Sequence, residues 1–174
     1  YGRHVSATLR TQYRMQPAIG DIVSEVFYQG QLETGKRPIP AHFDKSPDCI
    51  ISGLTWLDSG VRGKKAHHQD QPGGGRSLIN HAEADAIIRM LKSIEDETEF
   101  TEALLDEMSH TQEPAIGVIC MYAEQKKLVR RKFAEQNWTE EFKRLVKIDT
   151  VDSYQGKENR IVIISLTRSN NELS

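Results

Sequence analysis

The stretch Ile116-Gly117-Val118-Ile119-Cys120 is a short, nearly continuous apolar run that is rich in β-branched side chains. Such a run is typical of a strand that is covered on both faces, as in a parallel sheet. Two more apolar runs follow it, Leu145–Thr150 and Ile161–Leu166. The helical pattern between the first two runs has an apolar face of Leu128, Val129 and Phe133. Strands that alternate with helices predict an α/β domain with a mostly parallel sheet and helices on both faces.

Two further helices are predicted on the N-terminal side of this pattern. Residues 17–27 carry apolar side chains at helical spacing, Pro17 suits a first helical position, and Gly30 can close the helix. Asn80 and Glu83 form a start that resembles a capping box, and an apolar stripe follows them. We expect a long helix there, with a break near residues 96–98.

The segments between these helices read as loops and one strand. Three prolines, at positions 38, 40 and 47, predict a loop, and Leu54-Thr55-Trp56-Leu57 predicts a short strand. Residues 59–77 are rich in Lys, His, Gln and Gly, which predicts a mobile surface loop. Trp56 and Trp138 are interpreted as packing residues.

Length and composition limit the possible functions. A chain of 174 residues is long enough for one hydrophobic core, so we expect a single domain. A net charge of −2 argues against a broad basic surface for nucleic acid, so any such contact depends on a few placed groups. The sequence has no run of roughly 18 apolar residues and no signal-peptide pattern. We therefore expect no membrane contact and a cytoplasmic protein, or a nuclear one in a eukaryote.

Two stretches carry a resemblance to a known family. Residues 11–17, Thr-Gln-Tyr-Arg-Met-Gln-Pro, resemble the TQYRMHP segment of superfamily 1B helicases, such as the nonsense-mediated-decay helicase and senataxin. Residues 150–159, Thr-Val-Asp-Ser-Tyr-Gln-Gly-Lys-Glu-Asn, with the apolar run and the Arg168-Ser169-Asn170 that follow, resemble motif V of that family. Two departures are Gln16, which replaces a histidine, and Cys120-Met121, which replace a Thr-Pro pair.

The resemblance implies a fold and a role within a longer protein. It implies a RecA-like, P-loop-NTPase-type three-layer sandwich, which is the second motor domain of an ATP-dependent helicase. The chain lacks a GxxxxGK[ST] P-loop of its own and ends shortly before the family's next arginine-bearing motif. The resemblance therefore implies an ATP site shared with an N-terminal RecA-like domain of the same protein. The residues that bind Mg²⁺ would belong to that N-terminal domain. The domain alone is expected to be a monomer that does not hydrolyse ATP.

The resemblance also assigns nucleotide contacts, each beside a simpler alternative. Arg14 would reach the γ-phosphate as an arginine finger, or it forms an ordinary surface salt bridge. Tyr13 would stack on adenine, or it is a half-buried core tyrosine. Gln12 would contact the nucleotide or orient its neighbours. Gly156 would let the backbone approach a phosphate, and Glu158 would accept a hydrogen bond from the ribose; otherwise they form a turn with a solvated charge.

Nucleic-acid contacts are expected where the second predicted strand ends. Thr150, Ser153 and Gln155 could hold successive phosphates of a single strand of DNA or RNA, although they could instead cap the next turn. Tyr122 belongs to the same expected surface by resemblance. Because these contacts are to phosphates, they do not distinguish RNA from DNA.

Other features favour simpler interpretations. His67, His68 and Asp70 are interpreted as solvated residues and not as a metal site. The basic side chains between positions 126 and 132 are interpreted as the outer face of a helix. A catalytically inactive helicase-like scaffold that binds nucleic acid is the main alternative function. A nuclease is disfavoured because its clustered acidic residues are missing from the sequence.

Overall fold

The computed structural model describes residues 9–36, 38–50, 52–70, 77–154 and 158–169. It divides the chain into two compact units, Tyr1–Trp56 and Leu57–Ser174. We call them the first and the second unit and describe each by itself.

The second unit is built around a three-stranded parallel sheet. Its central strand is β5 (Ile116–Cys120), which lies between β6 (Val146–Thr150) and β7 (Ile161–Ser165). Ile116 lies opposite both Val146 and Ile161, and the register continues without a bulge to the last residue of each strand. The parallel sheet and the three strands predicted from the apolar runs are therefore confirmed.

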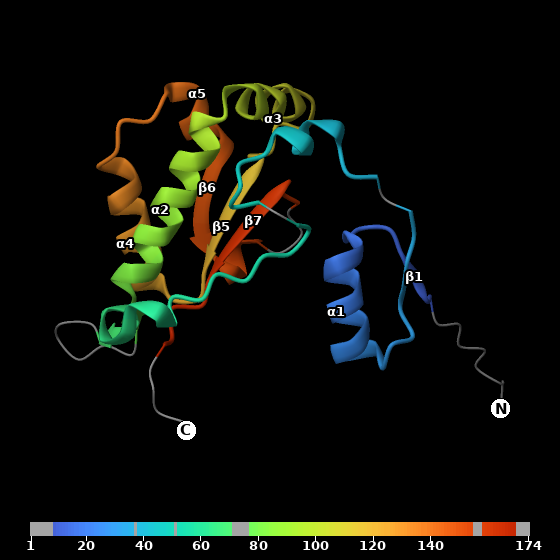
Figure 1. Cartoon of the computed structure of the whole chain (residues 1–174), viewed down its shortest axis with the longest axis horizontal. Coiled ribbons are helices and arrows are strands. Elements are labelled where there is room, and N and C mark those ends of the chain that lie inside the picture. Colours follow the sequence, from blue (N-terminus) through green and yellow to red (C-terminus); the bar gives the residue numbers. More distant parts are fainter. Residues whose placement is uncertain (1–8, 37, 51, 71–76, 155–157, 170–174) are drawn as a thin grey trace, which may run out of the picture. The chain divides into compact units, whose positions relative to one another are not determined.

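Two helices cover one face of this sheet. Figure 1 shows α2 (His81–Asp96) and α4 (Ala123–Ala134) side by side along the strands. The apolar core between helices and sheet is fully or almost fully buried, and its members include Leu91, Ile94, Ile116, Val118, Leu128, Val129 and Ile163. The predicted inward position of Leu128 and Val129 is confirmed.

The opposite face of the sheet is less covered than the sequence predicted. Burial alternates along β7, where Val162 is 48% exposed and Ile164 is 54% exposed. The expectation that this run is buried on both faces is therefore wrong for the second unit. An unbroken apolar run predicts which residues avoid water, but successive side chains in a strand still point to opposite faces. What covers each face is decided by the surrounding elements.

The predicted capping of α2 and the break after it are both confirmed. The Asn80 side chain accepts a hydrogen bond from the Glu83 backbone N–H at 3.1 Å. Helix α2 ends at Asp96, and Glu97, with ψ 83°, separates it from α3 (Thr98–Thr111). The Thr101 hydroxyl then donates to the Ile94 carbonyl at 2.8 Å, which ties the two helices together across the break.

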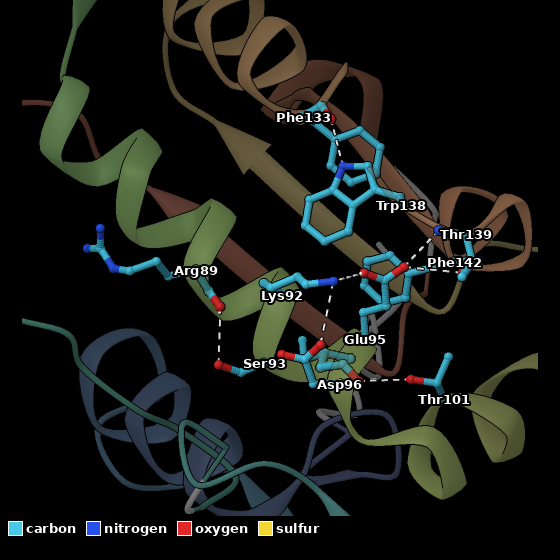
Figure 2. Close-up of polar contacts among 11 residues, drawn as sticks. Arg89, Lys92, Ser93, Glu95, Asp96, Thr101, Phe133, Trp138, Thr139 and Phe142 are labelled. Carbon is cyan, nitrogen blue, oxygen red and sulfur yellow. Dashed lines mark hydrogen bonds and ion pairs between the residues drawn. The ribbon is translucent and has the colours of Figure 1, made fainter. Parts of the chain in front are cut away.

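An aromatic stack fixes the segment that leads into β6, as Figure 2 shows. The Trp138 ring lies between Phe133 and Phe142, with centroid distances of 4.9 and 5.3 Å. The indole N–H donates to the Phe133 carbonyl at 2.6 Å, and the Lys92 ammonium lies 5.7 Å from the ring centre. Trp138 is only 6% exposed, so its interpretation as a packing residue is confirmed.

A carboxylate on α2 holds the start of a short helix that the sequence reading missed. Glu95 accepts a hydrogen bond from the Thr139 backbone N–H at 2.8 Å and pairs with Lys92 at 2.7 Å (Figure 2). The Thr139 side chain caps α5 (Glu140–Leu145) through the Phe142 N–H at 3.2 Å. The helix has only six residues, so its stability depends on this tertiary contact and not on an extended apolar pattern.

One prediction for the connecting segments is wrong. Residues 54–57 form no strand, because an apolar run without a hydrogen-bonding partner cannot form a sheet. Trp56 is 78% exposed, so its interpretation as a packing residue is also wrong. The predicted loop at residues 59–77 contains the 3₁₀ segment η2 (Gly60–Ala66). It also contains β3 (Gln69–Asp70), which pairs antiparallel with β4 (Leu78–Ile79). Residues 71–76 of that loop lie outside the described residues.

Within its described residues, the first unit contains a small parallel strand pair and one α-helix. Strand β1 (Thr11–Gln12) pairs with β2 (Glu33–Thr34), and α1 (Pro17–Tyr28) connects them; the 3₁₀ segment η1 (Ala41–Lys45) follows. The predicted helix at residues 17–27 is confirmed. Gln29, with φ 54°, and Gly30, with φ 72°, end it in left-handed conformations, and the Gly30 N–H donates to the Ser24 carbonyl at 3.0 Å.

The two tryptophans provide a matched test of this fold. Replacing Trp138 by Ala removes a buried stacked ring and should lower the free energy of unfolding by about 3–5 kcal/mol. Replacing the exposed Trp56 by Ala should change it by less than about 0.5 kcal/mol. Urea unfolding of both variants, followed by circular dichroism, measures the difference. Equal losses in the two variants would contradict the described packing.

Candidate functional site

The side chain of Gln12 organises the turn that carries Tyr13 and Arg14. Its amide oxygen accepts hydrogen bonds from the backbone N–H groups of Arg14, at 2.8 Å, and Met15, at 2.7 Å. Its amide nitrogen donates to the Met15 carbonyl at 3.1 Å and to the Thr34 hydroxyl at 2.9 Å. A side-chain amide offers two acceptor sites and two donors, so these contacts use its full capacity. Gln12 thus holds the turn in one conformation.

A glycine in α1 makes this arrangement possible. Gly20 is buried, and a Cβ atom at this position would overlap the Thr34 hydroxyl and lie 2.9 Å from the Gln12 amide nitrogen. Only a residue without a side chain therefore allows α1 to approach the hydrogen-bonded pair. Sequence reasoning missed both Gly20 and Thr34, because their importance lies in a contact between segments that are distant in the sequence.

The same turn presents an aromatic ring and a guanidinium group. Tyr13 is 69% exposed, which is more than a half-buried core tyrosine would be, and Arg14 is also exposed. The Tyr13 ring lies against Gly35, where an added Cβ atom would overlap the ring. The Gly35 N–H donates to the Gln12 carbonyl at 2.8 Å, which keeps this glycine beside the turn.

The chemistry of this turn fits one side of a nucleotide. An exposed tyrosine ring offers a face for a base, and an exposed guanidinium offers a planar set of donors that match phosphate oxygens. Within the described residues, no three His, Cys, Asp or Glu side chains gather where they could hold a metal ion. The described groups could therefore hold a base and a phosphate, and they offer no carboxylate cluster for Mg²⁺.

A second group of predicted residues lies at the C-terminal edge of the sheet. Thr150 is the last residue of β6 and lies opposite Cys120, the last residue of β5. Tyr122 follows two residues later, where its carbonyl accepts the Lys126 N–H at the start of α4 at 3.0 Å. Thr150 and Tyr122 are both partly buried. The structure therefore brings them to the same edge, where open α/β sheets bind ligands.

The Asp149 side chain connects this edge of the sheet to α4. Burial by itself would raise the pKa of Asp149, but hydrogen bonds from the Thr150 N–H, at 2.9 Å, and the Lys126 ammonium, at 3.2 Å, lower it below its ordinary value. Arg130 donates to the Ile148 carbonyl at 2.9 and 2.6 Å from two of its nitrogens. Part of the basic cluster on α4 is therefore engaged with β6 and is more than a solvated helix face.

Residues on both sides of the 155–157 segment, which lies outside the described residues, pack against the sheet. Ser153 is exposed in the 3₁₀ segment η3 (Val151–Tyr154), and the Tyr154 hydroxyl donates to the Lys147 carbonyl at 2.6 Å. Burial raises the pKa of Tyr154 to about 12. The Tyr154 ring and the Asn159 side chain both lie against Gly117 in β5, where a Cβ atom would be within 3.0 Å of each. These two residues of the motif-V-like stretch are therefore packing residues.

Glu158 lies at the other end of the sheet from Thr150. The adjacent Asn159 donates from its side chain to the Pro114 carbonyl at 2.6 Å, and the Arg160 N–H donates to the Ala115 carbonyl at 2.8 Å, just before β5 begins. Glu158 is exposed beside this edge. The structure thus separates the predicted ribose contact from the predicted phosphate contact at Thr150. Gln155 and Gly156, two other predicted site residues, lie outside the described residues.

The histidines at positions 67 and 68 are partly buried, so their interpretation as solvated residues is corrected. The Nδ1 atom of His68 lies 2.9 Å from the Ser169 carbonyl oxygen and 3.2 Å from the Ser169 N–H nitrogen. His68 therefore joins the loop before β3 to the segment that follows β7.

The comparisons with known proteins agree with this architecture. The family model described as an AAA domain matches residues 1–174. The chain is 30% identical to the DNA replication ATP-dependent helicase/nuclease dna2 of Schizosaccharomyces pombe, over 95% of the chain and 12% of the relative. It is 28% identical to the 5'-3' DNA helicase ZGRF1 of Mus musculus, over 95% and 8%. It is 26% identical to the ATP-dependent helicase NAM7 of Saccharomyces cerevisiae, over 97% and 16%.

The chain thus spans less than a fifth of the length of each of these helicases. No helix in the described ranges is long and apolar enough to cross a membrane. The mixed α/β architecture with parallel strands is consistent with a RecA-like fold. Because the family model covers the whole chain, the chain belongs to the AAA domain family, and it is homologous to superfamily 1 helicases of the Dna2, NAM7 and SEN1 type.

Proposed function

We propose that the chain is the second RecA-like motor domain of a longer ATP-dependent superfamily 1 helicase. The observation that carries this proposal is the turn at Tyr13 and Arg14, in which Gln12 uses its whole hydrogen-bonding capacity to fix two exposed residues. Rigid presentation of a ring and a guanidinium group serves a ligand better than it serves the fold. The relatives that match almost the whole chain are helicases, and two of them are named as ATP-dependent, so we infer that the ligand is ATP.

The proposed ATP site is shared with a first motor domain of the same protein. Bound ATP with Mg²⁺ supplies a phosphoryl group whose transfer needs charge stabilisation more than covalent chemistry. Arg14 neutralises negative charge that develops on the γ-phosphate, and Tyr13 stacks against the adenine. Gln12 positions both residues through the turn. Glu158 and Gly156 bind the ribose and a phosphate, and the Mg²⁺ ligands belong to the first domain.

The proposed path of the nucleic-acid strand follows the C-terminal edge of the sheet. Thr150 and Tyr122 lie together there, and Ser153 is exposed just beyond Thr150. Hydroxyl groups at this edge hold phosphates without reading the bases, so one surface accepts DNA or RNA. Gln155 belongs to this set by its place in the sequence. Closure of the two motor domains over ATP then changes the grip on the strand.

Replacing Arg14 by Ala in the helicase that contains this chain tests the catalytic role. ATP turnover should fall by about three orders of magnitude, with a much smaller change in ATP binding, because the contact strengthens in the transition state. Arg10→Ala is the matched control, since Arg10 is also exposed in the first unit and the charge change is the same. Steady-state ATPase rates measure both variants. Normal turnover in Arg14→Ala would contradict the catalytic role of Arg14, whereas no turnover in the unmutated helicase would favour the inactive nucleic-acid-binding scaffold.

Replacing Gly35 by Ala tests the role of the Tyr13 ring. The new methyl group must displace the ring, so KM for ATP should rise about as much as it does in Tyr13→Ala, by roughly tenfold for a lost stacking contact. Gly53→Ala is the control, because a Cβ atom there makes only ordinary contacts of 3.6 Å or more.

The double variant Gly35→Ala/Tyr13→Ala separates the ring from other effects of the substitution. If Gly35 acts through Tyr13 alone, the double variant should have the same KM as Tyr13→Ala. Additive increases in KM would show that Gly35 affects the site by another route.

A further inference from the structure

Strand β7 ends in a turn with an uncommon backbone conformation. The Arg168 N–H donates to the Leu166 carbonyl at 2.7 Å, which closes a three-residue γ-turn with Thr167 at its centre. Thr167 has a φ of 67°. A γ-turn of this hand is rare and strained, and a β-branched residue with such a φ is a true outlier. Something outside the turn must therefore hold it.

Side chains from α2 and from the residue before it hold this turn on both sides. The Glu83 carboxylate accepts hydrogen bonds from the Thr167 N–H, at 2.9 Å, and from the Ser165 hydroxyl, at 2.6 Å. The Asn80 side chain donates to the Thr167 carbonyl at 3.1 Å. Thr167 and Asn80 are completely buried, and Ser165 is 1% exposed. The peptide groups of Thr167 are therefore fixed by two residues that lie far from it in the sequence.

A third element completes this cluster. The Gln125 side chain on α4 donates to the Ser165 hydroxyl, at 3.1 Å, and is itself completely buried. A buried polar network of this kind is specific, because each member that lost its partner would be left unsatisfied in a low-dielectric interior. A glycine at position 167 would adopt the same φ without strain. The cluster therefore maintains a geometry that the backbone preference of a threonine disfavours.

The place of the turn indicates what this geometry serves. Strained residues cluster at ligand sites, and the turn follows the C-terminal end of a parallel strand, where open α/β sheets bind ligands. The Met121 N–H donates to the Ser165 carbonyl at 3.3 Å, so the turn borders the edge that carries Tyr122. Arg168, the last residue of the turn, is exposed.

We propose that Arg168 is a further phosphate-binding residue and that Glu83 is its positioning residue. Arginine suits this role because its planar set of donors matches phosphate oxygens in two-point contacts. The phosphate belongs either to the nucleic-acid strand or to the nucleotide. This inference rests on the proposed motor function, and it adds one residue to the phosphate contacts already proposed.

The test compares two arginines at opposite ends of β7 in the helicase that contains this chain. Arg168→Ala removes the proposed contact, and Arg160→Ala makes the same charge change at the other end, where Arg160 pairs with Glu107 at 2.6 Å. Affinity for a fluorescent oligothymidylate is measured at several salt concentrations, and KM for ATP is measured with the strand saturating. A loss of at least about tenfold is expected for a hydrogen bond to a charged group.

The two measurements identify the source of the phosphate. A strand contact predicts weaker oligothymidylate binding for Arg168→Ala and a salt-dependence slope smaller by about 0.7, with KM for ATP unchanged. A nucleotide contact predicts the reverse pattern, a higher KM with normal strand binding. Either result supports the proposal if Arg160→Ala leaves both quantities unchanged. Arg168→Ala values equal to those of Arg160→Ala in both assays would overturn it.

A second variant tests the positioning role. Glu83→Gln keeps the size of the side chain but weakens its acceptor for the Thr167 N–H, so it should reproduce the effect of Arg168→Ala. The double variant Glu83→Gln/Arg168→Ala should then be no worse than Arg168→Ala alone. If Glu83→Gln only lowers the unfolding midpoint and leaves binding and KM unchanged, Glu83 has a structural role alone. If the unmutated helicase neither binds the strand nor hydrolyses ATP, the proposed function itself fails and this inference fails with it.

Discussion

Two buried hydrogen bonds between Asn80 and Gln125 hold the second unit together. The Asn80 N–H donates to the Gln125 side-chain oxygen at 2.8 Å, and the Gln125 side-chain nitrogen donates back to the Asn80 carbonyl at 3.1 Å. The pair joins the start of α2 to α4, which follows β5. The Asn80 side chain also donates to the Ala66 carbonyl at 2.8 Å, so the segment before β3 is fixed to the same point. Both residues are completely buried, which makes these bonds costly to leave unmade.

The two units use the same physical device to present functional groups. In each, a polar side chain fixes the backbone of a neighbouring turn: Gln12 in the first unit, and Glu83 with Asn80 in the second. The residue presented in each case is an exposed arginine, Arg14 or Arg168. A side chain placed by a rigid turn loses less conformational freedom when it binds a ligand. For the proposed motor function, in which the chemistry depends on charge stabilisation, such placement is an advantage.

Local patterns predicted the parts of the fold that depend on local chemistry. The strands β5, β6 and β7 and the cap at Asn80 follow from apolar runs and from one side-chain hydrogen bond, and these predictions are confirmed. The helix α5 was missed, because its start is fixed by Glu95 from a distant helix. The strand expected at residues 54–57 was wrong, because a strand needs a partner that the apolar pattern does not supply. The candidate site shows the same division, since nothing local revealed that Glu158 and Thr150 lie at opposite ends of the sheet.

We propose that this chain forms one half of a shared ATP site. Calorimetry with ATP and Mg²⁺ tests it most directly, first on the chain of 174 residues and then on a longer form that includes the N-terminal neighbour. We expect the chain alone to show no saturable binding tighter than about millimolar, because its described residues offer a ring and a guanidinium but no phosphate cradle. The longer form should bind ATP and hydrolyse it faster when single-stranded nucleic acid is added. Micromolar binding or hydrolysis by the chain alone would show that the ATP site is not shared.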